Sequence, residues 1–396
     1  MTAGGAGDRP ASASAARGSA LSVTLLSDAP VYGGGERYLE TLAAGFPPEE
    51  VRADVILSEA ADLDACAARL NARGLHVTRL PAVTVLKDVG PLLRNLWRLA
   101  WRRTQLIHAN LVDPRACNGA IVAAAMAGHR AILATEHLPS SPFDDKPAPL
   151  RHRTASALIR RRIVVSEASK AALVARGVAA ETVDVVPNGI VEPPYLGRAA
   201  ARHLLWPGCQ GPLIGWSGRL AAQKRPELFV QIAQRVARAR PDVRFVLLGD
   251  GALRADLEAL VRAGGLSDVV RLVGHRPDAP SLYAGLAVLV MTSRYEGQPL
   301  TLIEAGLAQT PVVAGRIPGL DEVVVDGAPG AETGTLVPPD DVDAYAAATL
   351  AWLADDDRRR AAGAAARARM LRRHSPQAMV RATIDAYRRV SPRAAR

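Results

Sequence analysis

Short runs of β-branched and other apolar residues alternate along this chain with amphipathic stretches rich in Ala and Leu. The apolar runs of the first half, which we expect to form strands, are 21–27, 53–58, 76–80, 106–110, 131–136, 162–166 and 183–187. The stretches with helical periodicity between them are 36–45, 62–73, 89–103, 114–127, 150–160 and 167–176. Regular alternation of strand and helix is typical of a parallel sheet that is covered by helices on both faces.

The alternation stops at 187–212, a stretch that holds five prolines and four glycines, and resumes after it. The later strands are expected at 213–217, 244–248, 270–274, 288–292 and 311–314, and the later helices at 225–239, 252–263, 279–285 and 300–308. A last stretch, 342–389, is expected to be helical throughout. The pattern predicts two α/β domains joined by a linker, with a ligand cleft where the carboxyl ends of their strands face each other.

The composition supports a globular protein. Hydrophobic residues make up 49% of the chain and charged residues 22%. Its length of 396 residues is too great for one ordinary domain. Residues 1–20 are mostly Ala, Gly and Ser and are expected to form a flexible tail. The sequence has no apolar run long enough for a membrane-spanning helix, and its first residues do not resemble a secretory signal. The three cysteines, Cys66, Cys117 and Cys209, form no CxxC pair. We therefore expect a cytoplasmic protein.

The net charge of +10 is unevenly distributed. Residues 355–396 hold twelve arginines against four aspartates. A basic tail can attract nucleic acid, but aromatic residues make up only 4% of the chain and form no stacking cluster. We interpret the arginines as a solvated helix surface and expect no nucleic-acid partner.

Glycines follow the first predicted strand. Gly33, Gly34 and Gly35 precede Glu36, where a helix is expected to begin. Such glycines let backbone N–H groups approach an anion at a helix N-terminus. An ordinary tight turn between strand and helix would use the same residues, so this loop alone leaves both interpretations open.

Two cations follow the first strand of the second half. Gly218 and Arg219 come directly after this strand, and Lys224 lies five residues after Arg219. An arginine and a lysine in one strand–helix loop suit a diphosphate, because arginine can contact it bidentately and lysine acts as a point charge. The alternative is a pair of solvated surface cations.

Two glutamates flank the start of another predicted helix. Glu296 follows a strand, Gly297 makes the turn and Pro299 suits the first helical turn, while Glu304 lies eight positions after Glu296. Glu296 can accept hydrogen bonds from sugar hydroxyls, and Glu304 can hold a ribose diol. The amides around 299–301 can approach a phosphate.

At this point the chain resembles a known family, the retaining glycosyltransferases of the GT-B fold, and family 4 in particular, through the E-x7-E motif at Glu296 and Glu304. Further segments resemble that family's glycine loop, interdomain PNG hinge, donor phosphate pair, GxG strand end and nucleobase loop; they are Gly34–Gly35, 185–190, 217–220 with Lys224, 248–251 and 273–274. The resemblance runs from about residue 21 to residue 376.

The resemblance implies two facing Rossmann-like domains with parallel sheets and an interdomain cleft. It divides the chain into a tail (1–20), an N-terminal acceptor-side domain (21–188), a hinge (189–212), a nucleotide-sugar-binding domain (213–374) and a C-terminal helix that crosses back to the N-terminal domain (375–396). The donor-binding residues that it implies are Gly34, Gly35, Gly218, Arg219, Lys224, Gly274, Glu296, Gln298, Pro299, Leu300, Thr301 and Glu304.

The implied catalytic residues are His137, Arg219, Lys224 and Glu296. His137 follows the strand 131–136 and looks like the family's active-site histidine, which positions the transferred sugar; taken alone, a histidine at a strand end is more often a structural donor. Positive charge at Arg219 and Lys224 would stabilise a departing diphosphate. Glu296 is expected to orient the donor sugar rather than to act as a covalent nucleophile.

The implied reaction moves a hexosyl or N-acetylhexosaminyl group from a nucleotide diphosphosugar, with UDP favoured, to an acceptor hydroxyl. It retains the anomeric configuration through front-face attack. Gln298 and the loop 314–319 depart from the family pattern, so the sugar cannot be carried over. A GT-B epimerase or phosphorylase, and a non-catalytic sugar- or nucleic-acid-binding module, are the alternatives.

We expect neither a metal nor another cofactor. Asp62 and Asp64 match a D-x-D metal motif formally, but they open a predicted helix, where acidic residues favour the helix dipole. Other paired acids read as loop or helix-start charges without a convincing ligand count.

Two segments bear on the acceptor, which we expect to be a small natural product or aminocyclitol, a glycan or a lipid-linked sugar. Residues 91–103 form a basic helix with tryptophans that can lie on the inner face of a membrane, but we favour a scaffold helix packed on the sheet. The loop 138–149 carries Asp144 and Asp145, which could attract a cationic acceptor or simply face solvent.

Overall fold

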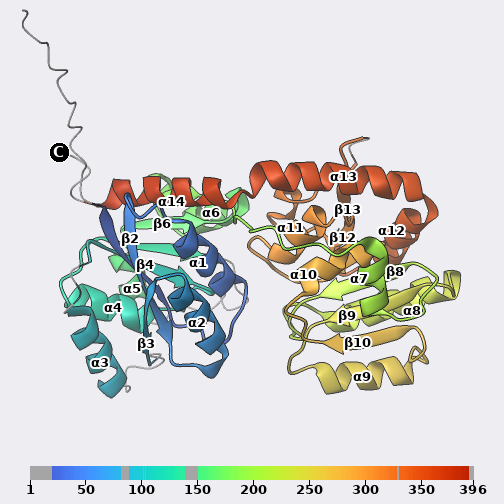
Figure 1. The fold of residues 1–396 in the computed structure, drawn as a ribbon, viewed down its shortest axis with the longest axis horizontal. Coiled ribbons are helices and arrows are strands. Elements are labelled where there is room, and N and C mark those ends of the chain that lie inside the picture. The colour runs from blue at the N-terminus through green and yellow to red at the C-terminus, as the bar shows by residue number, and fades with distance from the viewer. Residues whose placement is uncertain are drawn as a thin grey trace, which may run out of the picture.

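The computed structural model describes residues 20–81, 89–100, 102, 104–138, 150–327 and 330–391. Apart from residues 20 and 138, the expected tail at 1–20 and the expected acidic loop at 138–149 lie outside the described residues. The described chain forms two lobes, each built around a parallel sheet with helices on both faces (Figure 1).

The first lobe contains a seven-stranded parallel sheet with the strand order β3-β2-β1-β4-β5-β6-β7. Its strands are β1 (Leu21–Ser27), β2 (Val51–Ser58), β3 (His76–Leu80), β4 (Leu106–Leu111), β5 (Ile132–Glu136), β6 (Arg161–Val164) and β7 (Val183–Val185). Its helices are α1 (Gly34–Gly45), α2 (Asp64–Ala72), α3 (Val89–Ala100), α4 (Asn118–Met126), α5 (Leu150–Leu158) and α6 (Glu167–Ala175). The central strands β4 and β5 are buried along their whole length, because helices cover both of their faces.

The second lobe contains a six-stranded parallel sheet with the order β10-β9-β8-β11-β12-β13. Its strands are β8 (Leu213–Ser217), β9 (Arg244–Leu248), β10 (Val270–Gly274), β11 (Val288–Met291), β12 (Val312–Gly315) and β13 (Gly334–Val337). Its helices are α8 (Pro226–Ala239), α9 (Arg254–Ala263), α10 (Ala279–Leu282), α11 (Leu300–Leu307) and α12 (Val342–Ala354). The edge strand β13 was not expected from the sequence. It has only four residues, and it is recognised as a strand because it pairs with β12.

The segment between the two sheets is more ordered than its proline and glycine content suggests. It holds the helix α7 (Arg198–Leu205), which the sequence pattern did not indicate. Ala201 and Leu205 of α7, together with Ile190, are buried in the core of the second lobe. The linker is therefore anchored on that lobe through Ile190 and α7.

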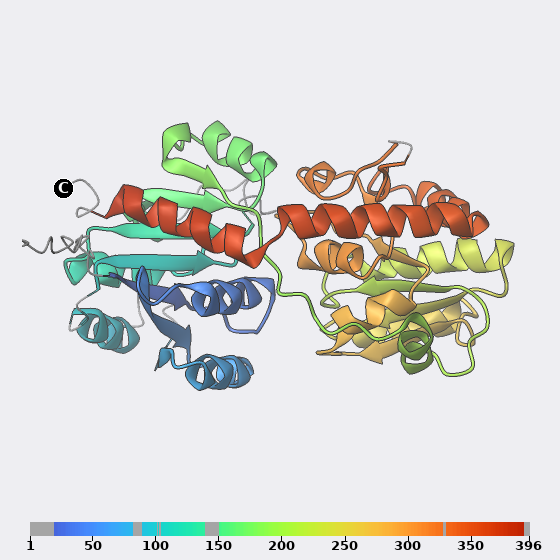
Figure 2. The ribbon, with the colours of Figure 1, turned by 45° about the horizontal axis from the view of Figure 1, so that its top comes forward.

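The last part of the chain is helical, as expected, and is divided into the three helices α12, α13 and α14. Asp355 caps α13 (Asp356–Arg373), its side chain accepting a hydrogen bond from the backbone of Arg358, and Ser375 caps α14 (Pro376–Val390). Helix α13 lies over the second lobe and α14 lies over the first, nearly end to end (Figures 1 and 2). Met379 and Ile384 of α14 are buried in the core of the first lobe, so the chain crosses between the lobes a second time.

The strand orders place the functional loops. In each sheet the order reverses at one point, between β1 and β4 in the first lobe and between β8 and β11 in the second. Loops that leave such neighbouring strands in opposite directions open a crevice at the carboxyl edge of the sheet, which is where ligands bind in α/β proteins. The glycine loop follows β1, the loop with Arg219 follows β8, and the segment with Glu296 follows β11.

Candidate functional site

A cleft of about 2270 Å³ is lined by residues of both lobes. Twelve of the thirteen residues predicted to bind or act on a donor line it; they are Gly34, Gly35, His137, Gly218, Arg219, Lys224, Glu296, Gln298, Pro299, Leu300, Thr301 and Glu304. Gly274 ends β10, and among the described lining residues its two successors, His275 and Arg276, take its place. The fold therefore brings residues from distant parts of the sequence into one cavity.

The loop that carries Lys224 is held in place by hydrogen bonds to Thr292, the residue that follows β11. Thr292, just after this strand, donates its hydroxyl to the backbone oxygens of Lys224 and Arg225, at 2.7 and 2.8 Å, and accepts from Trp216 Nε1 at 3.0 Å. Arg225 has a left-handed φ of 48°, is 6% exposed and donates from Nε to the Thr292 carbonyl at 2.7 Å. Arg225 and Thr292 were not among the residues predicted from the sequence. Neither lines the cleft, and both act by supporting the loop that does.

A second loop packs on the first. Leu220 N donates to the Asp250 carbonyl at 2.9 Å, and a Cβ on Gly249 would lie 1.8 Å from the Gly218 carbonyl oxygen. Gly249 also has a φ of 148°, a region that side chains rarely adopt. Glycine is required here because the two backbones approach so closely, and this contact sets the position of the loop with Arg219.

The loop that carries Arg219 and Lys224 meets the segment that begins at Glu296. Lys224 Nζ forms an ion pair with Glu296 Oε1, and the side chains of Lys224 and Glu296 are 23% and 7% exposed. Arg219, at the same edge of the cleft, is exposed. The loop thus presents one cation held by a carboxylate and one cation directed to solvent.

Helix α11 directs its N-terminus into the cleft. Pro299 is its N-cap, so the helix begins at Leu300, and the free amides of its first turn favour a negatively charged group. Glu304 lies one turn further along, is 2% exposed and forms an ion pair with Arg37 of α1 in the first lobe. Arg37 was not among the residues predicted from the sequence.

Gln298 links this segment to the linker. Its Oε1 accepts a hydrogen bond from the backbone N of Asn188 at 2.7 Å, and its backbone oxygen accepts from Asn188 Nδ2 at 3.1 Å. The carbonyl of Asn188 in turn accepts from His374 Nδ1 at 2.9 Å. The side-chain amide of Gln298, which we expected at the donor, is thus engaged by Asn188, the residue just before the expected hinge.

His137 faces this segment from the first lobe. Its Nε2 lies 2.8 Å from Asn110 Oδ1, and Asn110 Nδ2 donates to the Gly35 carbonyl at 3.1 Å. Because that carbonyl can only accept, Oδ1 is the acceptor for His137, and His137 carries its proton on Nε2. Burial lowers the pKa of His137 to about 4, so the ring is neutral near pH 7.

A buried polar chain lies behind His137. His108 of β4 contacts the Tyr387 hydroxyl through Nδ1 and the Thr135 hydroxyl through Nε2, both at 2.7 Å. The Thr135 hydroxyl also lies 3.1 Å from that of Tyr38, whose ring packs edge-on against His137 at 4.7 Å. Helix α14 is thereby connected through Tyr387 to the groups that support His137.

The lobes also meet at the rim of the cleft. A Cβ on Gly297 would lie 1.8 Å from the His137 carbonyl oxygen, so only glycine fits between them. The carboxylate of Glu322 accepts hydrogen bonds from the backbone of Glu167 and Ala168 at 3.1 Å, capping α6 from the opposite lobe. These contacts join the two lobes beside His137 and at the start of α6.

No group of three or more His, Cys, Asp or Glu side chains is arranged to hold an ion within the described residues. Asp64 of the formal D-x-D match begins α2 and pairs with Arg79 Nη1 at 2.6 Å.

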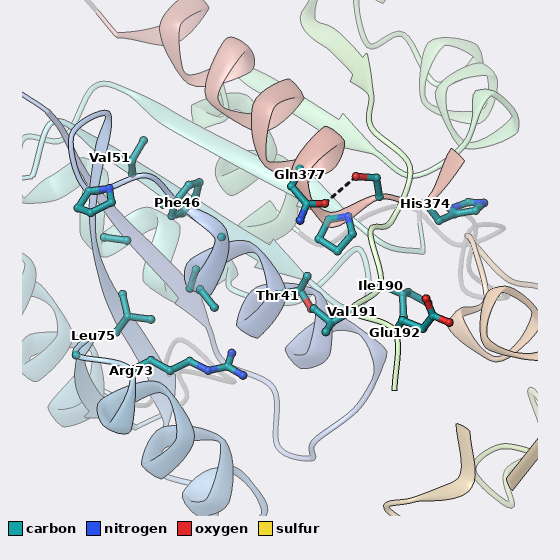
Figure 3. A pocket seen from close by; sticks show the side chains of 18 of the residues that line it. Thr41, Phe46, Val51, Arg73, Leu75, Ile190, Val191, Glu192, His374 and Gln377 are labelled. Atoms are coloured by element: carbon teal, nitrogen blue, oxygen red, sulfur yellow. Dashed lines mark hydrogen bonds between the residues drawn. The ribbon is translucent and has the colours of Figure 1, made fainter. Parts of the chain in front are cut away.

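A second cavity, of about 900 Å³, borders the same linker (Figure 3). Thr41 and Phe46 at the end of α1 line one side, Ile190 and Glu192 of the linker another, and His374 the junction of α13 and α14. Gly189 shows how tight this junction is, because a Cβ there would lie 2.6 Å from Pro376 Cα.

Helix α3 packs one face on the core of the first lobe and exposes the other face to solvent. Leu99 is fully buried in the core of the first lobe, whereas Leu93 and Trp97 are 56% and 57% exposed. Arg98 lies over the Trp97 ring at 5.1 Å. In the described part of the chain, every helix is too short or too polar to cross a bilayer.

Comparisons with known proteins agree with this architecture. Residues 32–192 match the family model described as Glycosyltransferase Family 4, and residues 211–355 match the one described as Glycosyl transferases group 1. In fold, the chain is similar to the Anabaena protein Alr3699/HepE, solved in complex with UDP and glucose, with a TM-score of 0.77 at 22% identity over 92% of this chain and 98% of that one.

Two curated relatives come from Streptomyces. The 2-deoxystreptamine N-acetyl-D-glucosaminyltransferase of Streptomyces fradiae is 32% identical over 266 residues, 63% of this chain and 61% of the relative. The 2-deoxystreptamine glucosyltransferase of Streptomyces kanamyceticus is 36% identical over 156 residues, 37% of this chain and 40% of the relative. The matches thus span less than two thirds of either relative. Each lobe thus matches a glycosyltransferase family model, and the chain as a whole has the same fold as Alr3699/HepE.

Proposed function

We propose that this protein is a retaining glycosyltransferase, which moves a hexosyl or N-acetylhexosaminyl group from a nucleotide diphosphosugar to an acceptor hydroxyl. The observation that carries the proposal is the meeting of two loops at one edge of the second sheet. Arg219 and Lys224 follow β8, and the N-terminus of α11 follows β11. Two cations and a helix N-terminus together form a site for a diphosphate.

The diphosphate is the leaving group in this reaction, so negative charge develops on it as the glycosidic bond breaks. In our proposal Lys224, which Glu296 holds, and the first amides of α11 supply positive charge there, and Arg219 adds charge from the exposed edge of the cleft. Fixed charges of this kind stabilise a transition state without reorganisation. Glu296 pairs with Lys224 through Oε1, which leaves its other carboxylate oxygen to accept from a hydroxyl of the donor sugar. Glu304 is assigned to the ribose.

His137 is proposed to position the transferred sugar from the acceptor-side lobe. Its neutral ring keeps Nε2–H on Asn110, which leaves Nδ1 as an acceptor for a sugar hydroxyl. We further propose front-face attack, in which the acceptor hydroxyl gives its proton to the departing phosphate oxygen. This accounts for retention without a covalent carboxylate intermediate.

UDP is the proposed nucleotide and an aminocyclitol the favoured acceptor. The structural relative named above was solved with UDP and glucose, and two relatives are named as transferases of 2-deoxystreptamine, which is an aminocyclitol. Glycans and lipid-linked sugars remain acceptors to be tested. The exposed Leu93 and Trp97 of α3, beside Arg94 and Arg98, provide the surface for a peripheral membrane contact if the acceptor is lipid-linked.

We propose that turnover needs no metal, because Arg219 and Lys224 supply positive charge where a divalent cation would otherwise neutralise the diphosphate. Turnover should then persist in excess EDTA. Loss of turnover in EDTA, restored by magnesium or manganese, would contradict this part of the proposal.

The experiment that tests the function is a panel of UDP-, GDP-, ADP- and dTDP-sugars incubated with aminocyclitol, glycan and lipid-linked acceptors. The released nucleotide is quantified, and the product anomer is assigned by NMR. We expect turnover with a UDP-sugar and an α-linked product from an α-linked donor. A β-linked product would overturn retention, and the absence of nucleotide binding by the wild-type protein would overturn the transferase proposal itself.

A further inference from the structure

The ion pair between Arg37 and Glu304 joins the two lobes across the cleft. Arg37 lies in the first turn of α1, directly after the glycine loop, and its Nη2 contacts Glu304 Oε1 of α11. The Arg37 side chain is 37% exposed, whereas that of Glu304 is 2% exposed. Helices α1 and α11 lie on the facing sides of the two lobes (Figure 1).

The surroundings of Glu304 explain why it needs a cation. Burial raises the pKa of Glu304, and the charge of Arg37 is the main influence that opposes this rise. The other titratable groups nearby are the phenols of Tyr283 and Tyr195, and the Tyr283 hydroxyl is directed to Ser217 Oγ at 2.7 Å. A carboxylate buried in this way without a cation would favour its neutral form.

We propose that Arg37 is a positioning residue for the nucleotide, which reaches across from the acceptor-side lobe and holds Glu304 as an ionised, oriented carboxylate for the ribose hydroxyls. The inference rests on the proposed function, in which Glu304 binds the ribose. Arg37 takes Oε1, and a carboxylate has two oxygens, so Oε2 is left to accept from the diol.

The contact lies where the two lobes touch. The glycine loop meets the start of α11 beside the pair, since a Cβ on Gly34 would lie 3.6 Å from Leu300 Cδ1. Arg37 and Glu304 therefore pair at a point of contact between the lobes. The nucleotide site belongs to the second lobe in sequence, but it is completed by a residue of the first.

The test uses the nucleotide diphosphate that binds the wild-type protein, which is UDP in our proposal, and its 2′-deoxy analogue. Dissociation constants for both are measured by calorimetry on the full-length wild type and on Arg37→Met, Glu304→Gln and the double variant. Arg235→Met is the matched control, because Arg235 pairs with Asp343 on the exposed surface at 2.9 Å.

We expect the wild type and Arg235→Met to prefer the ribonucleotide by about tenfold, the worth of one hydrogen bond to a charged group. In Arg37→Met the preference should fall to about twofold or less, and the double variant should show no further loss, because both residues act through one contact. Arg37→Lys keeps the charge and should retain part of the preference. It also serves if Arg37→Met does not fold.

The outcomes separate this inference from the function on which it rests. If the wild type binds UDP and prefers the ribonucleotide, but Arg37→Met and Arg37→Lys keep the full preference, the inference is overturned and the function stands. If weaker binding in Arg37→Met affects both nucleotides equally, Arg37 is structural only and the inference is again overturned. If the wild type binds no nucleotide, the proposed function fails first.

Discussion

The side chain of Gln298 and the backbone of Asn188 form a direct link between the glutamate segment and the linker. Gln298 Oε1 accepts from Asn188 N at 2.7 Å, and Asn188 Nδ2 donates to the Gln298 carbonyl at 3.1 Å. Both residues are buried, with 7% and 4% exposure. The linker is therefore directly connected to the segment between Glu296 and the start of α11, which is where the donor is proposed to bind.

Gln298→Met should remove the side-chain hydrogen bond of this link, from Asn188 N to Gln298 Oε1, while preserving side-chain volume. It leaves the buried amide of Asn188 without its acceptor, which costs about 1–3 kcal/mol of unfolding free energy. We expect urea denaturation to show this loss and donor turnover to fall as well. Gln231→Met, on the exposed face of α8, is the control and should change stability by less than about 0.5 kcal/mol. Equal stability of the two variants would show that the link is energetically unimportant.

Lys224→Met should reduce turnover strongly. It removes a cation from the proposed diphosphate site and leaves Glu296 buried without its partner. Loss of one such group typically costs about 10²–10³ in kcat. Steady-state release of nucleotide measures the effect, and Lys224→Arg, which keeps the charge, should recover part of the rate. A Lys224→Met variant with wild-type turnover would remove this loop from the mechanism.

Asn110→Leu should affect catalysis more than nucleotide binding. Asn110 fixes the orientation of His137 but belongs to the opposite lobe from the proposed nucleotide site. Loss of this hydrogen bond should lower kcat about tenfold, while the dissociation constant for UDP stays within about twofold. Asn71→Leu, on the exposed side of α2, is the matched control. A parallel loss of UDP affinity would indicate a general structural defect instead.

The stability of the fold should fall on acidification below pH 6.5. Burial lowers the pKa of His108 to about 3, and those of His137 and His374 to about 4, from an ordinary value of 6.5. Above pH 6.5 these rings are neutral in both states. Between pH 6.5 and about 4 the unfolded chain binds protons that the folded chain does not, so each ring lowers the unfolding free energy by about 1.4 kcal/mol per pH unit.

Chemical denaturation followed by circular dichroism at pH 7.5, 6.0 and 5.0 measures this slope. His374→Asn should make it shallower, because one of the three rings is removed. A His374→Asn variant with the same slope as the wild type would show that His374 does not resist protonation in the folded state.

Much of the donor side of the cleft could be predicted from residues near one another in the sequence. The loop at Gly218–Lys224 and the segment at Glu296–Glu304 each follow a strand, and the ends of parallel strands meet at one edge of a sheet. The strand β13 and the helix α7 were missed, because four residues beside glycines and eight residues within a proline-rich linker carry too little periodicity.

The α/β architecture of two parallel sheets and the loops that line the cleft could be predicted from the order of residues, because strand and helix periodicity and strand-end glycines are local properties of the chain. The side chains that meet across the lobes became evident only in the folded molecule. Arg37 contacts Glu304, Asn188 contacts Gln298 over 110 positions, and Tyr387 contacts His108 over 279 positions. Such pairings depend on how the two lobes and α14 pack together, and packing over these distances leaves no periodic signal in the sequence.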